Sequence, residues 1–99
     1  MNKELKQKYK ADIVIVKRLV NEFDPCGLIY GGAPDDEYDC LIQRILSRIY
    51  SKTPKQEIST YVLHEVDDHF GCPVPETHKA QFSADLDNML DKLIKQIIK

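Results

Sequence analysis

Apolar side chains recur every three or four residues along most of the chain, which is the spacing of one face of an α-helix. Charged and polar residues stand between them, so each segment is amphipathic and has one face to bury. A β-branched run at 13–16 would also suit a strand, but the helical spacing continues on both sides of it and favours a helix. The pattern predicts an all-α, single-domain fold spanning 1–99, with helices at about 3–23, 36–51, 54–70 and 77–98.

Residues that favour helix ends mark the predicted boundaries. Pro25 should end the first helix, because the residue before a proline is pushed out of the α region. Asp35 or Asp36 can cap the second helix, and the sequence TPKQ at 53–56 fits a capping box with its threonine as the N-cap. Gly71 is expected to stop the third helix.

The Gly/Pro-rich loop at 24–35 is expected to be ordered, with its apolar middle, Leu28 and Ile29 together with Tyr30, packed on the bundle. A phosphate-binding loop is excluded, because no Lys or Arg lies between Arg18 and Arg44 and the following helix starts with acids. Glycine supplies turn freedom and proline limits the helices. The positions expected to shape the loop are Pro25, Gly27, Leu28, Gly31, Gly32 and Pro34.

Charge is distributed unevenly, although the net charge is only −2 and the pI is about 5.9. Residues 1–20 carry six Lys or Arg and two acids, whereas residues 21–40 carry six acids and no Lys or Arg. Nucleic-acid binders usually have a dominant basic field, so this balance argues against a nucleic-acid partner. The acidic region instead predicts a protein-binding surface formed by Asp24, Asp35, Asp36, Glu37, Tyr38 and Asp39.

The three cysteines, Cys26, Cys40 and Cys72, are odd in number, widely spaced and without a C-x-x-C pair. This usage predicts reduced, partly buried thiols, and neither a disulfide framework nor a zinc site. No run of about 18 apolar residues, as a membrane helix requires, occurs in the sequence. Residues 1–12 lack the apolar segment of a signal peptide. We therefore expect a cytoplasmic protein without a membrane partner.

The sequence HEVDDH at 64–69 is the nearest approach to a metal or catalytic motif. The zinc helix H-E-x-x-H needs two histidines four residues apart, but Asp68 stands at that position and His69 follows it. His64 and Asp68 could share a metal, yet they supply only two ligands. No G-x-S-x-G nucleophile motif is present. The sequence predicts no enzyme, no cofactor and no metal ligand; the alternative is a small metal-dependent enzyme or factor that uses carboxylates with His64 or His69.

Three pieces of the chain carry a resemblance to a known family: FDPCGLI (23–29), GAPDDEYD (32–39) with Ile42, and HFG (69–71). Together they are similar to the YugE-like family, small helical proteins of bacilli and related bacteria that are catalogued as a domain of unknown function. The resemblance covers roughly residues 20–71. The family commonly has Trp where Phe23 stands and an aliphatic residue where Cys26 stands. It implies an all-helical fold and no known activity, cofactor or catalytic residue.

The small size, the acidic region and the lack of a catalytic set predict a non-catalytic helical module that binds a protein partner. One concrete version is an immunity-type protein that inhibits a basic toxin. A structural alternative is a homodimer formed through apolar residues that lie off the main stripes, namely Leu63, Ile97 and Ile98.

Overall fold

Four α-helices and one short 3₁₀ turn make up the regular structure of the described part of the chain. A computed structural model describes residues 3–72 and 74–98, with side chains from residue 5 onward. Over these residues it contains no β-strand, which confirms the predicted all-α fold. In chain order the elements are α1 (Lys3–Phe23), α2 (Asp39–Tyr50), α3 (Lys55–Asp68), η1 (Glu76–His78) and α4 (Lys79–Ile97).

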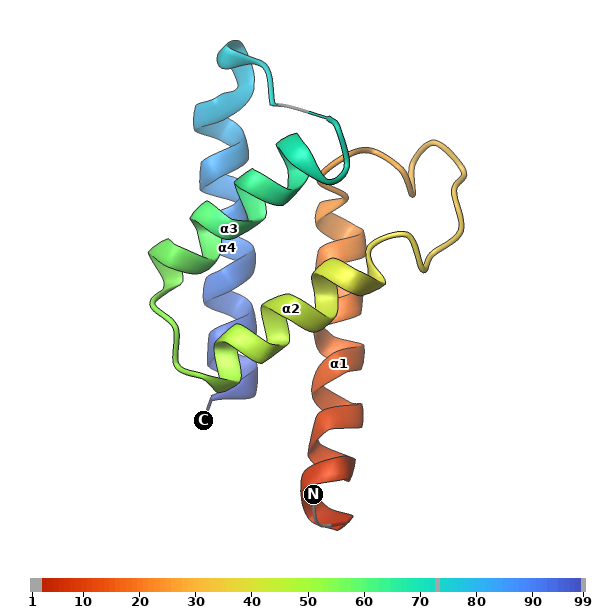
Figure 1. The fold of residues 1–99 in the computed structure, drawn as a ribbon, viewed down its shortest axis with the longest axis vertical. Helices are drawn as coiled ribbons and strands as arrows, with labels where there is room; N and C mark the ends of the chain where they lie inside the picture. The colour runs from red at the N-terminus through yellow and green to blue at the C-terminus, as the bar shows by residue number, and fades with distance from the viewer. Residues whose placement is uncertain (1–2, 73, 99) are drawn as a thin grey trace.

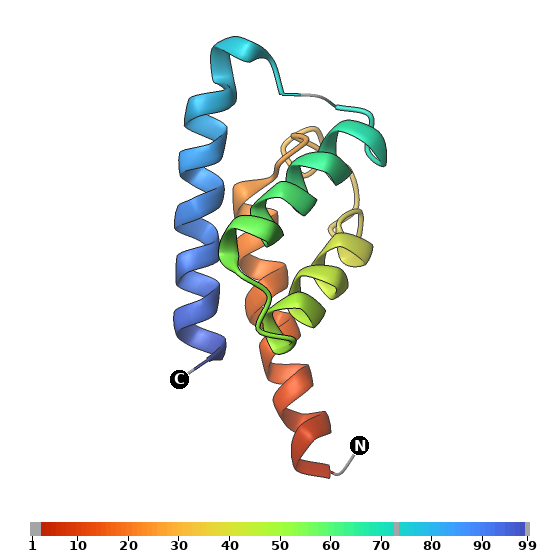
Figure 2. The same cartoon turned by 60° about the vertical axis from the view of Figure 1, so that its left-hand side comes forward.

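The helices form two layers that cross at an angle (Figures 1 and 2). α1 and α4 run in opposite directions in one layer, and α2 and α3 lie across them in the other. The main contacts join α1 to α2, α2 to α3, α3 to α4 and α4 to α1, so each helix packs on two others. The first turns of α1 extend beyond the other helices, and the loop between α1 and α2 projects near the other end of the molecule (Figure 1).

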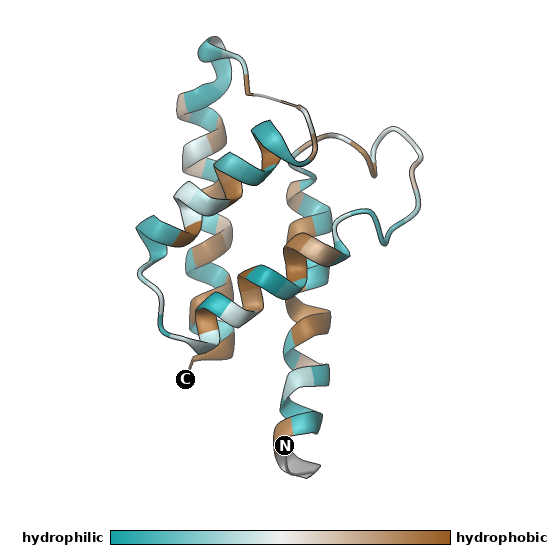
Figure 3. Ribbon diagram, in the orientation of Figure 1, coloured by the Kyte–Doolittle hydropathy of each residue, from teal (hydrophilic) through white to brown (hydrophobic). Residues whose placement is uncertain are grey.

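The apolar core lies between the two layers, where the apolar stripes predicted from the sequence face one another. In Figure 3 apolar and hydrophilic stretches alternate along the helices, as amphipathic helices require. Full burial of one aliphatic side chain stabilises a fold by roughly 1.5–3 kcal/mol, so this cluster is the main source of stability. Its buried members are Val16, Val20, Tyr38, Leu41, Ile42, Ile45, Leu46, Ile49, Ile58, Val62, Val66, Leu86, Met89, Leu90, Leu93 and Ile97.

The start of α2 differs from the prediction. The helix begins at Asp39 and not at residue 36, and no side chain caps its first turn, so the predicted caps Asp35 and Asp36 are wrong. The backbone before α2 runs through turns instead, with the amide of Asp39 donating to the carbonyl oxygen of Asp36 at 3.1 Å. These turns place Tyr38 in the core immediately before the helix, where burial of its ring outweighs a regular N-cap.

The start of α3 also lacks the predicted capping box. The N-cap position is taken by Pro54, and no side chain caps this end of the helix. The amide of Thr53 instead donates to the carbonyl oxygen of Arg48 at 3.0 Å, so Thr53 belongs to the turn that closes α2. α3 ends at Asp68, two residues before its predicted end, and Gly71, the predicted stop, follows with a φ of +65°. α1 ends at Phe23, as the proline at position 25 predicted, and α4 begins at Lys79, two residues later than expected.

Candidate functional site

The loop of residues 24–38, called the clamped loop below, begins with an aspartate whose carboxylate points inward. Asp24 has a φ of +50° and its amide donates to the carbonyl oxygen of Val20 at 2.7 Å, which closes the last turn of α1. Its carboxylate accepts hydrogen bonds from the amides of Ile29 at 3.1 Å and Tyr30 at 2.9 Å, and from the hydroxyl of Tyr38 at 2.6 Å. Asp24 therefore folds the loop back onto the end of α1.

The hydroxyl of Tyr38 is the second centre of this network. It accepts hydrogen bonds from the amides of Cys26 at 2.9 Å and Leu28 at 3.4 Å while it donates to Asp24. The tyrosine is fully buried, and its ring meets the edge of the Phe70 ring at a centroid distance of 5.5 Å. One hydroxyl group thus connects the two ends of the loop.

The protonation of this pair follows from its surroundings. Burial and the hydrogen bond to the Asp24 carboxylate raise the pKa of Tyr38 to about 12. Burial alone would raise the pKa of Asp24, but the hydrogen bonds from Tyr38 and from the amides of Tyr30 and Ile29 outweigh it and lower that pKa. At neutral pH the clamp is therefore a neutral tyrosine that donates to an ionised carboxylate, which is a strong hydrogen bond.

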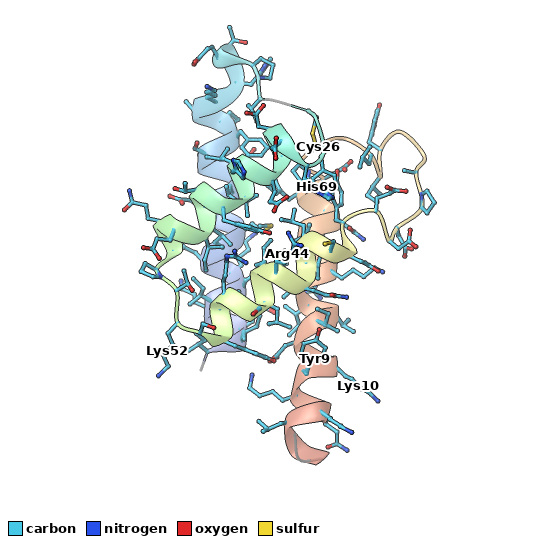
Figure 4. All side chains as sticks on the ribbon, in the orientation of Figure 1. Tyr9, Lys10, Cys26, Arg44, Lys52 and His69 are labelled. Atoms are coloured by element: carbon cyan, nitrogen blue, oxygen red, sulfur yellow. A yellow bond between two sulfur atoms is a disulfide. The ribbon has the colours of Figure 1, made fainter. Side chains whose placement is uncertain are left out.

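A disulfide between Cys26 and Cys72 forms the covalent part of the clamp. The two Cα atoms lie 6.0 Å apart although 46 residues separate them in sequence. The prediction of three reduced, partly buried thiols is therefore wrong: Cys40 is the free cysteine of the described residues, and it is exposed. The reason is topological, because the packing of the layers brings the end of α1 beside the end of α3, near His69 in Figure 4.

Glycines allow the middle of the clamped loop to turn tightly. The amide of Gly31 donates to the carbonyl oxygen of Gly27 at 3.0 Å, and a Cβ atom on Gly31 would lie only 3.2 Å from that oxygen. Gly32 has a φ of +93°, a conformation that other residues rarely adopt. The amide of Ala33 then donates to the carbonyl oxygen of Leu28 at 2.9 Å and closes the loop on itself.

The apolar middle of the loop points in two directions. Leu28 and Ile29 are half-buried against the core, as predicted. Tyr30, which was expected to pack inward with them, is 96% exposed. Because the amide of Tyr30 is held by Asp24 and the glycines on either side of the turn are constrained, its side chain is directed away from the bundle.

The acidic residues before α2 also divide into two groups. Asp39 forms an ion pair with Lys17 of α1 at 3.2 Å, and this contact raises the pKa of Lys17. The carbonyl oxygen of Asp35 accepts a hydrogen bond from the side-chain amide of Asn21 at 3.2 Å, but its carboxylate is exposed. The acidic rim that remains open to solvent consists of Asp35, Asp36 and Glu37.

The structure therefore changes the set of residues predicted to bind a partner. Asp24 and Tyr38 are internal parts of the clamp and are not available to a partner, and Asp39 is half-buried in its ion pair. Of the predicted loop-shaping positions, Gly31 and Gly32 form the turn described above. The exposed position of Tyr30 and the pairing of Cys26 with Cys72 were not predicted from the sequence.

His64 lies within α3 and His69 follows it; each is at a long distance from an acid, and the His69 ring meets the Phe70 ring edge-on. His64 Nε2 lies 4.0 Å from Asp68 Oδ2, and His69 Nδ1 lies 3.9 Å from Glu65 Oε2. Within residues 3–72 and 74–98, no three His, Cys, Asp or Glu side chains converge as metal ligands would. Nor does any described helix have the length and apolar character to cross a membrane.

The chain was compared with protein families, curated proteins and solved structures. No protein-family model, curated protein or solved structure matches the chain. The candidate site is therefore defined by the chain's own contacts: a clamped loop that carries one exposed aromatic side chain and three exposed acids.

Proposed function

We propose that the chain is a non-catalytic protein-binding module whose contact surface is Tyr30 together with the acidic rim. The observation that carries the proposal is a 96% exposed tyrosine on a loop that is held by a disulfide and by buried hydrogen bonds. A loop that only connected two helices would not need two restraints to keep one aromatic side chain exposed to solvent. The restraints fix the position from which Tyr30 can enter a partner's pocket.

The chemistry of this surface suits a protein partner. Tyrosine is enriched among the residues that dominate interface energies, because it offers a large amphipathic contact and loses little side-chain entropy. A loop that is already ordered avoids the cost of ordering it on binding. The three rim carboxylates lie in a stretch without Lys or Arg, so they would attract a basic surface and orient it. A basic toxin, inhibited in the manner of an immunity protein, is one partner of this kind.

The proposal also includes a family, the YugE-like proteins, and a compartment, the cytoplasm. The resemblance to the YugE-like family of bacteria agrees with a helical fold and adds no activity, so it leaves the binding proposal unchanged. The disulfide bears on the predicted cytoplasmic location, because disulfides persist in oxidising compartments and cytosolic thiols are kept reduced. Thiol labelling of the protein taken from its native cells tests this: one reactive thiol would mean that the disulfide forms there, and three would mean a reducing compartment.

A quantitative affinity experiment tests the proposed surface. The purified chain is immobilised with its disulfide intact, and proteins retained from a native lysate are compared between wild type, Tyr30→Ala and Asp36→Lys/Glu37→Lys. A matched control, Asp67→Lys/Asp68→Lys, makes the same change of charge on two exposed acids at the end of α3. A retained protein is then purified and its affinity for each variant is measured by titration.

The expected result is one partner that binds wild type and the α3 control alike, and that binds the two loop variants at least about tenfold more weakly, as the loss of a hot-spot side chain would cause. Salt should weaken binding to wild type more than binding to the charge-reversed rim. A partner with the same affinity for all four proteins would contradict the proposed surface, as would a partner lost only in the α3 control.

A further inference from the structure

A second site lies near the opposite end of the bundle, in a cavity of about 620 Å³ between α1 and the last turns of α2 and α4. Its volume falls in the range of about 300–1,000 Å³ that is usual for small-molecule sites. The walls are largely apolar and include Ile15, Ile49 and Ile98, the last of which is 46% exposed. Five polar side chains also line the cavity, and the first three of them contact one another: Lys8, Asp12, Tyr50, Lys52 and Gln96.

Three groups surround the ammonium of Lys8: the Asp12 carboxylate, the Tyr50 ring and the carbonyl oxygen of Ile97. Lys8 Nζ forms an ion pair with Asp12 Oδ2, lies 5.1 Å from the centroid of the Tyr50 ring, and donates to the carbonyl oxygen of Ile97 at 3.4 Å. A carboxylate, an aromatic face and a carbonyl oxygen are the groups that bind organic ammonium ions. The same Asp12 oxygen also accepts a hydrogen bond from the Tyr50 hydroxyl at 2.6 Å, which fixes the carboxylate in place.

The electrostatic field at this position favours a cation beyond these contacts. Asp12 is only 6% exposed, so its charge is poorly screened by water. α2 ends at Tyr50 and α4 ends at Ile97, and both residues line the cavity. A helix C-terminus carries a partial negative charge, so two helix dipoles add to the field of the buried carboxylate. An anionic or neutral head group would lose this stabilisation.

Lys8 is suited to give way to another ammonium ion. Its side chain is 49% exposed, whereas that of its partner Asp12 is 8% exposed, so the lysine can swing into solvent while the carboxylate cannot. Among the apolar lining residues, Ala11, Ile15 and Ile98 keep part of their surface exposed, whereas Ile49 is buried. We propose that this cavity binds a small amphipathic primary amine, whose ammonium replaces that of Lys8 and whose hydrocarbon chain covers Ala11, Ile15 and Ile98.

Calorimetric titration of the oxidised protein at neutral pH tests this proposal with three probes of equal chain length: n-octylamine, n-octanol and octanoate. Wild type should bind the amine in preference to the alcohol and to the carboxylate. Lys8→Met removes the internal competitor and should tighten amine binding by about tenfold, since a competent state that is populated a tenth of the time weakens apparent affinity by that factor. Lys10→Met, on the same helix and exposed, is the matched control and should behave like wild type (Lys10 is labelled in Figure 4).

The variant Asp12→Asn should lose the preference for the amine. If that variant does not fold, the head-group comparison in wild type and Lys8→Met decides the matter alone. Equal affinity for octylamine and octanol in Lys8→Met would overturn the proposal, and so would equal amine affinity in wild type and Lys8→Met. Nα-acetyl-lysine amide serves as a fourth probe: if it binds as tightly as n-octylamine, the apolar walls take no part and a small amphipathic ligand is the wrong occupant.

Discussion

The hydroxyl of Tyr38 joins the hydrogen bonds that hold the clamped loop, so its removal is the most direct test of the clamp. Tyr38→Phe deletes one oxygen atom and keeps the ring that packs on Phe70 in the core. Asp24 loses a hydrogen bond of 2.6 Å, and the amide of Cys26 loses its acceptor. The disulfide and the apolar contacts of the loop are unchanged, so the experiment isolates the hydrogen bonds.

The expected cost follows from the charge and burial of these groups. A hydrogen bond to an ionised partner contributes about 1.5–3 kcal/mol to stability. The amide that is left without an acceptor adds a further cost. We therefore expect Tyr38→Phe to lower the free energy of unfolding by about 2–3 kcal/mol. That is a large part of the roughly 5–15 kcal/mol typical of a domain. For a chain of this length it corresponds to a fall in Tm of roughly 10–20 °C.

Chemical denaturation under non-reducing conditions measures this cost, with Tyr30→Phe as the control. The control removes a hydroxyl from the same loop, but from a side chain that is 96% exposed, and should change stability by less than about 0.5 kcal/mol. Hydrogen exchange adds a local readout, because the amides of Ile29 and Tyr30 donate to Asp24 and should lose protection in Tyr38→Phe. Equal denaturation midpoints for the two variants would refute the argument that the hydroxyl organises the loop.

Three further changes test other parts of the fold. Cys26→Ser/Cys72→Ser should lower the free energy of unfolding by about 4 kcal/mol, from the entropy of closing a loop of 46 residues, and a native thiol titration should find one free thiol in wild type. Because hydrogen bonds lower the pKa of Asp24 below its ordinary 3.8, its stabilisation is present above that value and is lost as pH falls through the lower folded-state pKa. The difference in unfolding free energy between wild type and Asp24→Asn should therefore shrink as pH falls below 3.8; a constant difference would contradict this. Gly71→Ala should cost about 1–2 kcal/mol in denaturation because of the positive φ, and Gly71→Asn less.

The helices were predictable because their apolar spacing reflects burial, which is the largest favourable contribution to folding. Apolar residues spaced three or four apart in the predicted last helix, namely Leu86, Leu90 and Leu93, are fully buried in α4. Helix ends were less predictable, since a cap contributes only about 1 kcal/mol and tertiary packing can override it. Burial of the Tyr38 ring did so at the start of α2, where it moved the helix away from the aspartates that could have capped it.

The candidate site was predictable only in part, because its position depends on contacts between distant segments. The stretch of acids was visible in the sequence, and it supplied the acidic rim of Asp35, Asp36 and Glu37. The inward turn of Asp24 depends on a left-handed backbone conformation, and no residue pattern distinguishes that aspartate from its exposed neighbours. An odd number of cysteines likewise cannot show which two meet when the helix layers pack.

The clamp has a covalent part, the disulfide, and a hydrogen-bonded part centred on Asp24, and a reducing agent breaks only the first. The hydrogen bond from Tyr38 to Asp24 lies within the clamped loop, whereas the disulfide joins the loop to Cys72 after α3. Reduction would therefore release the loop from the end of α3 and lower global stability, while the fold of the loop itself would persist. Tyr30 would keep its local backbone geometry, because the amide of Tyr30 would still be held by Asp24. A reducing compartment would therefore lower the stability of the domain and leave one of the two restraints on its proposed binding surface, the hydrogen bonds to Asp24.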